Sequence, residues 1–538
     1  MAEETAPPVA APPGPADDGR LPESTSRARL ITVLVTVVLL AEIIPFTYSL
    51  AMVITPLVGK SFPAAGAQIS WMVTIIGIVG GATIVLITKA ADLWGKKRMM
   101  LISAVVFWIG TLLCATTSVW ALFLVGRGLE GIAIAMSALC YSLIRDIMPR
   151  SWVPITIGFM GTGIGISGVA APLIGGWLTD TWDWRAIFWF MVVYMAVAIA
   201  LFIPLVPESG IRKRQRLDIP GVIGVGLGVT GVLLYLSEGS SWGWAAPKSL
   251  VCLIVGVIML AAFLWWQTKT SAPTVSLRLF RQPKVAGLLL ISFVFTGTYT
   301  VFTYLPAFMY MISDKMIKGE ILAQAVAKAP KGTTMALLEK LITFHGDLSY
   351  GAGFDLFGFA WHILLVGGIA GMILGPVAAA WSRKVGGRIP MLVGMVFMVI
   401  AGVGMVLWHD WLAGAIFFVA ASVGMGMYYG TSPNMLIDVV PPEEQAISAG
   451  AVAGIGSIGT SFITAILTSV LVLSPFTLTA MEPKGGTMVP VTSVVPQVYT
   501  YSGYTWAYVV GLIGAVLCVL IVLSLKAGRE PAQGGIRA

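Results

Sequence analysis

Fourteen long apolar stretches divide this 538-residue chain, and they limit its fold more than any other feature. Each stretch has about the 20 residues that an α-helix needs to cross a bilayer core. The stretches are unbroken rather than alternating, so helices are favoured over the strands of a membrane barrel. The predicted spans are 31–57, 67–88, 99–118, 121–143, 153–178, 186–206, 219–237, 249–267, 285–311, 354–380, 389–408, 411–435, 447–474 and 503–525.

Charged residues make up only 11% of the chain, against about 25% in soluble proteins. This scarcity excludes a cytosolic enzyme, a nucleic-acid binder and a disordered scaffold. The four cysteines lie inside apolar stretches without metal-ligand spacing, so neither a disulfide nor a metal site is expected. The composition therefore predicts an all-α polytopic membrane protein.

The basic residues predict the orientation. Most of the 33 Lys and Arg residues fall in segments that are cytoplasmic if the N-terminus is cytoplasmic, including the clusters at 89–98, 212–216 and 383–388. The positive-inside rule then puts both termini in the cytoplasm. We expect residues 1–30 and 526–538 to be cytoplasmic tails, and we expect the first of them to be disordered. No cleavable signal peptide is expected.

Two segments between spans are too long to be simple connectors. Residues 312–353 include TTMALLEKLITF, where the helical spacing of Met335, Leu338, Leu341 and Ile342 indicates a short amphipathic helix on the outer leaflet. Residues 475–502 include VPVTSVVPQVYTY, which partly alternates as a strand or hairpin does. Both segments lie on the outer side in the predicted topology. A functional role and an insertion without function both stay open.

The segment that follows the second span carries the first motif. It reads Thr88-Lys-Ala-Ala-Asp92-Leu-Trp-Gly95-Lys96-Lys97-Arg98. The glycine permits a tight reversal, the basic cluster anchors the loop on the cytoplasmic face, and Asp92 can pair with a neighbouring helix in one conformational state only. This loop resembles the signature of the major facilitator superfamily, and that resemblance implies a gating role for Asp92, Gly95, Lys96, Lys97 and Arg98.

Two further motifs resemble elements of the same family. LFLVGRGLEGIAIA in the fourth span puts Arg127 in the family's basic position, with Glu130 where a glutamine is usual. GFMGTGIGISGVAAPLIGG in the fifth span resembles the antiporter motif through Pro172, Gly175 and Gly176. That motif marks exporters more than importers, although small residues and a proline also serve helix packing alone.

Three stretches are similar to the fourteen-span drug:proton antiporter branch: Trp184-Arg185-Ala-Ile-Phe188, Leu217-Asp218-Ile-Pro-Gly221 and Ser276-Leu-Arg-Leu-Phe280-Arg281. The resemblance implies two six-helix halves, residues 31–206 and 285–525, joined by a two-helix insert with its linkers at 207–284. One departure is clear: the branch's first-span aspartate is replaced by Thr47, and Glu42 stands nearer the cytoplasm.

Two carboxylates are expected deep in the spans. Glu42 lies about 16 Å from the cytoplasmic end of its helix, at about 1.5 Å per residue, and Glu130 stands one turn from Arg127. Ionisable groups at such depth mark proton pathways. We predict that Glu42 and Glu130 carry protons and that Arg127 modulates Glu130. The alternatives are that Glu42 hydrogen-bonds a neighbouring helix and that Glu130 only neutralises Arg127.

A central cavity rich in aromatic side chains suits a lipophilic and possibly cationic solute. A role in pH sensing and a simple hydrogen bond both stay open for His362. The candidate lining residues are Phe46, Tyr48, Tyr141, Tyr299, Phe302, Tyr304, His362, Tyr428, Tyr429 and Asn434.

The resemblance implies proton-coupled efflux of amphipathic or lipophilic drugs or natural products, and so a part in antibiotic resistance, from a bacterial plasma membrane. The expected partners are the solute, protons and membrane lipids, and neither nucleic acid nor a second subunit is expected. No cofactor is expected, because the proton gradient supplies the energy. Two alternatives stay open: a dedicated exporter of one endogenous lipid, siderophore or antibiotic, and an uptake symporter or facilitator. No catalytic constellation favours an enzyme.

Overall fold

The computed structural model describes residues 19–62, 71–211, 218–270, 281–328, 335–441, 444–484 and 487–531. In these ranges, thirteen helices are long and apolar enough to span a bilayer. A further helix, α7 (Val153–Thr181), is continuous over 29 residues. Together they coincide with the fourteen predicted spans, which confirms the all-α polytopic fold.

The spans follow one another along the chain, and three of them are interrupted helices. They are α1 (Arg27–Ala41) with α2 (Ile43–Ser61), α3 (Trp71–Trp94), α4 (Lys96–Thr116), α5 (Trp120–Gly131) with α6 (Ile134–Ile147), α7, α8 (Arg185–Leu205), α9 (Ile219–Trp242), α10 (Pro247–Gln267), α12 (Pro283–Tyr310), α15 (Leu356–Phe359) and η2 (Ala360–Leu364) with α16 (Leu365–Val385), α17 (Arg388–Leu407), α18 (Trp411–Ile437), α19 (Gln445–Val472), and α20 (Tyr501–Ser524).

Local sequence signals set where several helices begin. Asp218 precedes α9 and accepts a hydrogen bond from the backbone N–H of Gly221 at 3.0 Å. Asp410 precedes α18 and accepts one from Ala413 at 3.0 Å. A proline stands in the first turn of α9, α10 and α12, where its missing N–H costs no helical hydrogen bond. Capped ends leave few backbone groups unsatisfied in an apolar surrounding.

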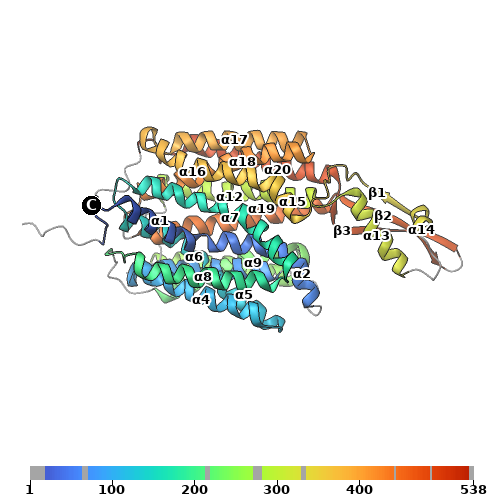
Figure 1. Ribbon diagram of the computed structural model, residues 1–538, viewed down its shortest axis with the longest axis horizontal. Helices are drawn as coiled ribbons and strands as arrows, with labels where there is room; N and C mark the ends of the chain where they lie inside the picture. Colours follow the sequence, from blue (N-terminus) through green and yellow to red (C-terminus); the bar gives the residue numbers. More distant parts are fainter. Residues whose placement is uncertain are drawn as a thin grey trace, which may run out of the picture.

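The helices form two bundles with separate apolar cores. Buried side chains of α1 to α8 make most of the first core, and those of α12 to α20 make the second. In Figure 1 the blue and green helices α4, α6 and α8 lie on one side and the orange helices α16 to α18 on the other. The bundles meet where α7 packs on α16 and α18, and where α3 packs on α19.

Helices α9 and α10 form a hairpin beside the two bundles. A methyl group added at Gly228 would lie 2.6 Å from Leu260, and one added at Gly231 would lie 2.6 Å from the carbonyl oxygen of Cys252. The two helices therefore approach closely along these glycines. On its other side α9 contacts α3 of the first bundle and α19 of the second.

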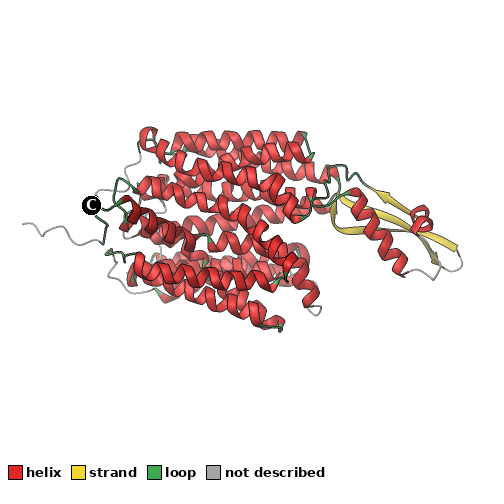
Figure 2. Cartoon of the chain, viewed as in Figure 1, coloured by secondary structure: helices red, strands yellow, loops and turns green. Residues whose placement is uncertain are grey.

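An appendage projects from one end of the bundles, opposite the end where the C-terminus lies (Figures 1 and 2). It consists of α13 (Asp314–Lys328), α14 (Met335–Leu341), β1 (Ile342–His345), β2 (Pro475–Lys484) and β3 (Thr487–Tyr499). The strands form one antiparallel sheet in the order β1-β2-β3. The predicted hairpin is present, and the predicted helix is present as α14, but it ends at Leu341 and Ile342 begins β1 instead of continuing it. The helix lies in the projecting appendage (Figure 1), and the single sheet that joins the two outer segments is a finding of the structure.

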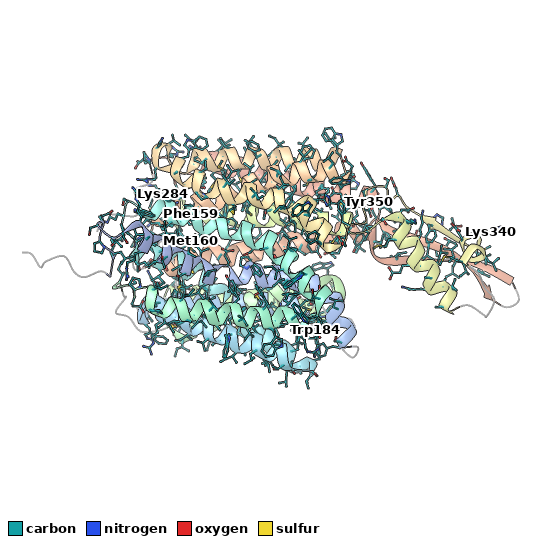
Figure 3. All side chains as sticks on the ribbon, viewed as in Figure 1. Phe159, Met160, Trp184, Lys284, Lys340 and Tyr350 are labelled. Atoms are coloured by element: carbon teal, nitrogen blue, oxygen red, sulfur yellow. The ribbon has the colours of Figure 1, made fainter. Side chains whose placement is uncertain are left out.

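The appendage is fastened to the second bundle at its base. The hydroxyl of Tyr350 donates to the carbonyl oxygen of Tyr499 at 2.6 Å, and the backbone N–H of Tyr501 donates to the carbonyl oxygen of Asp347 at 3.1 Å. Figure 3 labels Tyr350 at this base and Lys340 farther out. These contacts join the appendage to the start of α20.

Candidate central cavity and buried charges

A cavity of about 610 Å³ lies between the two bundles. Its described walls come from α1, α2, α3, α6 and α7 on one side and from α12, α18 and α19 on the other, and α9 contributes Leu233 and Ser237. Apolar surface dominates the lining, and hydroxyl groups interrupt it. A concave apolar site with a few polar groups is the usual form of a small-molecule site.

Glu42 stands at the junction of α1 and α2, and its side chain lies on the cavity wall. The residue is only 6% exposed. Its Oε2 accepts a hydrogen bond from the Ser167 hydroxyl of α7 at 2.8 Å. Glu42 is the one acidic residue among the described lining residues. Thr47, at the position of the branch's aspartate, donates instead to the carbonyl oxygen of Ile43 in its own helix at 2.7 Å.

The predicted aromatic residues divide into two groups. Tyr48, Tyr141, Tyr299, Tyr428 and Tyr429 line the cavity. The described lining does not include the other five, Phe46, Phe302, Tyr304, His362 and Asn434.

Contacts elsewhere account for three of the second group. Phe46 stacks on Phe190 at a centroid distance of 6.0 Å, in the first core. His362 lies in η2, where its Nδ1 is 2.7 Å from the carbonyl oxygen of Gly358. Asn434 donates to the carbonyl oxygen of Gly430 at 3.0 Å. A direct contact between these side chains and a solute stays a prediction.

Arg127 and Glu130 form the ion pair that their spacing predicts. Arg127 Nη1 lies 2.5 Å from Glu130 Oε2, and its Nε donates to the carbonyl oxygen of Met72 at 2.8 Å. Thr111 donates to Glu130 Oε1 at 2.9 Å. Neither charged residue is among the described residues that line the cavity. The pair therefore neutralises itself inside the first bundle, beside α3.

The motif loop between α3 and α4 is held by buried charges. Lys96 Nζ lies 2.5 Å from Asp146 Oδ2, which also accepts from the Ser209 hydroxyl at 2.6 Å. Glu208 accepts from the backbone N–H groups of Lys97 and Arg98 at 2.9 and 3.2 Å. A carboxylate at this helix N-terminus is stabilising because it satisfies free N–H groups.

Two residues of the loop have specific structural roles. Gly95 has φ +113°, a conformation that favours glycine. Asp92 accepts a hydrogen bond from the backbone N–H of Ile447, in the first turn of α19. This hydrogen bond joins α3 of the first bundle to α19 of the second, at the end of the bundles where the C-terminus lies.

The antiporter-like motif lies within α7, one of the helices through which the two bundles meet. Pro172 is inside the helix, and Pro172, Gly175 and Gly176 are all buried. The Thr179 hydroxyl donates to the carbonyl oxygen of Gly175 at 2.8 Å. The helix that carries them packs on α2 of its own bundle and on α16 and α18 of the other.

Sequence reasoning missed two sets of site residues. Asp146 and Glu238 are buried carboxylates that lie in α6 and α9, just beyond the predicted ends of their spans. The second set is the row of hydroxyl residues on α12 and α19. Their spacing of four residues is a helical-face signal that could have found them.

The sequence profile of the Major Facilitator Superfamily matches residues 37–316, which is more than half of the chain. The chain belongs to this superfamily. It is therefore a multi-pass membrane protein of a transporter superfamily.

Individual relatives are distant. An uncharacterized MFS-type transporter of Mycobacterium tuberculosis is 30% identical over 42% of this chain, and the match spans about a third (33%) of that protein. The multidrug resistance protein Stp of the same species is 23% identical over 77% of this chain and 71% of its own length. Among solved structures, the proton:xylose symporter XylE aligns with a TM-score of 0.58 at 12% identity, over 95% of this chain and 99% of XylE. This last likeness shows the shared fold.

Proposed function

We propose that this transporter exports amphipathic or lipophilic solutes in exchange for protons, by alternating access to the central cavity. The observation that carries the proposal is Glu42: an acidic side chain on the cavity wall, bonded to Ser167 in the motif helix α7. A carboxyl group can hold either a proton or a solute cation but not both, and this competition is the simplest basis for exchange. The name of the relative Stp, a multidrug resistance protein, supports efflux.

Alternating access requires contacts between the bundles that can break. Asp92 with Ile447 is one such contact. Thr88 is another, because a methyl group added at Gly450 would lie 3.0 Å from its side chain. Both contacts lie where α3 and α19 meet. They close the cavity towards the end of the bundles that carries the C-terminus, and rocking of the halves would open it there.

Transport into inside-out vesicles tests the coupling. An imposed proton gradient, acidic inside, should drive uptake of a lipophilic cation by the parent protein. Glu42→Gln should lose gradient-driven uptake while keeping solute-for-solute exchange, because the amide cannot carry a proton. Glu320→Gln, in the appendage helix α13, is the matched control. Parent-like uptake by Glu42→Gln at every pH would refute the proposal, and uptake driven only by the reversed gradient would favour a symporter.

The same experiment separates the two buried acids. Glu130 lies in a closed ion pair with Arg127, so Glu130→Gln should damage folding or expression more than coupling. If Glu130→Gln folds normally and loses only coupling, the proton pathway includes Glu130 as well. This outcome would support the second carrier predicted from the sequence.

We further propose that the chain is a monomer of a bacterial plasma membrane with both termini in the cytoplasm. The bias of basic residues supports this orientation. The appendage then lies outside the cell, at the end of the bundles opposite the C-terminus (Figure 1). Labelling of Lys340→Cys by a membrane-impermeant maleimide in intact cells should succeed. If labelling requires broken cells, the appendage lies in the cytoplasm and the proposed topology is wrong.

A further inference from the structure

One wall of the cavity carries a row of hydroxyl groups that bridges two helices. Ser292, Thr296 and Thr300 follow one another at four-residue intervals on α12. The Ser292 hydroxyl donates to the carbonyl oxygen of Val452 at 2.8 Å. The Thr296 hydroxyl oxygen lies 2.7 Å from the carbonyl oxygen of Gly456. The hydroxyl oxygens of Thr300 and Thr460 are 3.4 Å apart. The partners on α19 also advance by four residues, so the contacts form a regular ladder.

The backbones of the two helices of this wall approach closely. A methyl group added at Gly459 would lie 2.1 Å from the carbonyl oxygen of Phe293, and one added at Gly297 would lie 2.7 Å from that of Gly459. Small residues permit this backbone approach, as they do in other membrane helix pairs. Because the backbones nearly touch, the short Ser and Thr side chains can span the gap.

The hydroxyl protons of four residues on this wall, Ser292, Thr296, Thr300 and Ser457, are already used. Thr296 has carbonyl oxygens of Ser292 and Gly456 within 2.8 Å, and Thr300 donates to the carbonyl oxygen of Thr296 at 2.8 Å. Ser457, on the same wall, donates to the carbonyl oxygen of Ala453 at 3.1 Å. Carbonyls only accept, so each hydroxyl acts as the donor. At least one lone pair on each of these oxygens remains to accept a further hydrogen bond.

The opposite wall also accepts. An ionised Glu42 has no proton to give, and the Ser167 hydroxyl occupies only its Oε2. Tyr141 and Tyr429 also line the cavity, where their rings add apolar surface and their hydroxyl groups can donate or accept. The site therefore combines one negative charge, a row of hydrogen-bond acceptors and aromatic surface.

A complementary ligand has one positive charge, several O–H or N–H donors and an apolar body. Resting on the proposed efflux function, we infer that the cavity selects hydroxylated amines, such as aromatic compounds that carry an amino sugar. Cations of equal charge without hydrogen-bond donors bind less well, because they leave the ladder oxygens desolvated and unpaired. A cavity of about 610 Å³ accommodates one molecule of drug size.

Equilibrium binding to the purified full-length protein tests the inference with two probes. Doxorubicin is an aromatic amine with an amino sugar, and tetraphenylphosphonium is a cation without donors. The test variant is the double substitution Thr296→Val with Thr300→Val, which keeps side-chain shape and removes two acceptors. It should weaken doxorubicin binding about tenfold and change tetraphenylphosphonium binding less than about twofold.

Two control variants separate chemistry from packing. Thr303→Val removes a hydroxyl of the same helix that bonds only to carbonyls of α12, at 3.2 Å, and it should change neither affinity. Thr296→Ser with Thr300→Ser keeps both hydroxyls and should keep doxorubicin binding. The inference is overturned if the valine variant weakens both probes equally, or if it weakens neither.

Binding also distinguishes this inference from the proposed function. If the parent binds doxorubicin in preference to tetraphenylphosphonium but moves neither probe along a proton gradient, the proton-coupled function fails and the selectivity stands. If Glu42→Gln abolishes coupled transport of both probes while the valine variant leaves their affinity ratio unchanged, the function stands and the selectivity fails.

Discussion

The bond from Asp92 to the backbone N–H of Ile447 gives the most direct test of the closed contact between the halves. That N–H lies in the first turn of α19 and has no acceptor within its own helix. A charge-assisted hydrogen bond of this kind stabilises by about 1.5–3 kcal/mol, and the helix dipole adds about 0.3–1 kcal/mol. Asp92→Asn keeps an acceptor oxygen of the same size but loses the charge, so we expect the closed state to lose about 1.4 kcal/mol of stability relative to the open state. The open state then gains about tenfold in relative population.

The assay measures access to the cavity from the side that the contact closes. Ser142 lines the cavity and is 2% exposed, so Ser142→Cys reacts with a maleimide only when the halves separate. Asp92→Asn should raise that alkylation rate about tenfold. The matched control is Asp183→Asn, an exposed aspartate in the turn before α8.

A cross-link supplies the reverse perturbation. A Cβ atom added at Gly450 would lie 3.4 Å from Cβ of Thr88, close to the separation in a disulfide. Thr88→Cys with Gly450→Cys should therefore cross-link under oxidation and suppress the alkylation. If Asp92→Asn leaves the rate unchanged while the cross-link still suppresses it, Asp92 does not hold the halves together.

Three further predictions concern stability. Lys96→Met should lower the free energy of unfolding by about 3–5 kcal/mol, because it leaves Asp146 buried without its partner; adding Asp146→Leu should recover most of this loss in thermal unfolding. Gly95→Ala should cost about 1–3 kcal/mol, because the residue has φ +113° and the new methyl group would lie 2.8 Å from Glu208 Oε2; equal melting temperatures would contradict this. Burial lowers the pKa of His409, in the turn between α17 and α18, from 6.5 to about 4. The unfolded chain therefore binds the proton more tightly, and stability present above pH 6.5 should be lost as the pH falls from 6.5 towards 4; His409→Gln should remove that part of the pH dependence of the melting temperature.

The sequence predicts the features that depend on neighbouring residues. A span is a local run of apolar side chains, so all fourteen can be found without knowing what they pack against. The ion pair of Arg127 with Glu130 follows from a separation of three residues on one helix. The helix α14 and the strands β2 and β3 follow from local periodicity.

Features that join distant residues could not be predicted in this way. Ser167 and Glu42 are 125 residues apart in sequence, and the bonds of the hydroxyl ladder join residues 160 apart. β1 joins the sheet from a different outer segment, with Ile342 opposite Ala480. Such pairings depend on how two bundles and an insert pack in space, and a single sequence contains no signal for them.

The position of α9 has a consequence for the movement of the two halves. α9 contacts α3 in one bundle and α19 in the other, so rocking must shear one of these contacts. Its fit to α3 is tight: a methyl group added at Gly81 would lie 2.8 Å from Leu233, and one added at Gly226 would lie 3.0 Å from the carbonyl oxygen of Ala82. The α9–α10 hairpin should therefore travel with the first bundle and slide over α19. The breadth of the sliding surface then limits how far the halves can rotate before lipid acyl chains enter the cavity from the side.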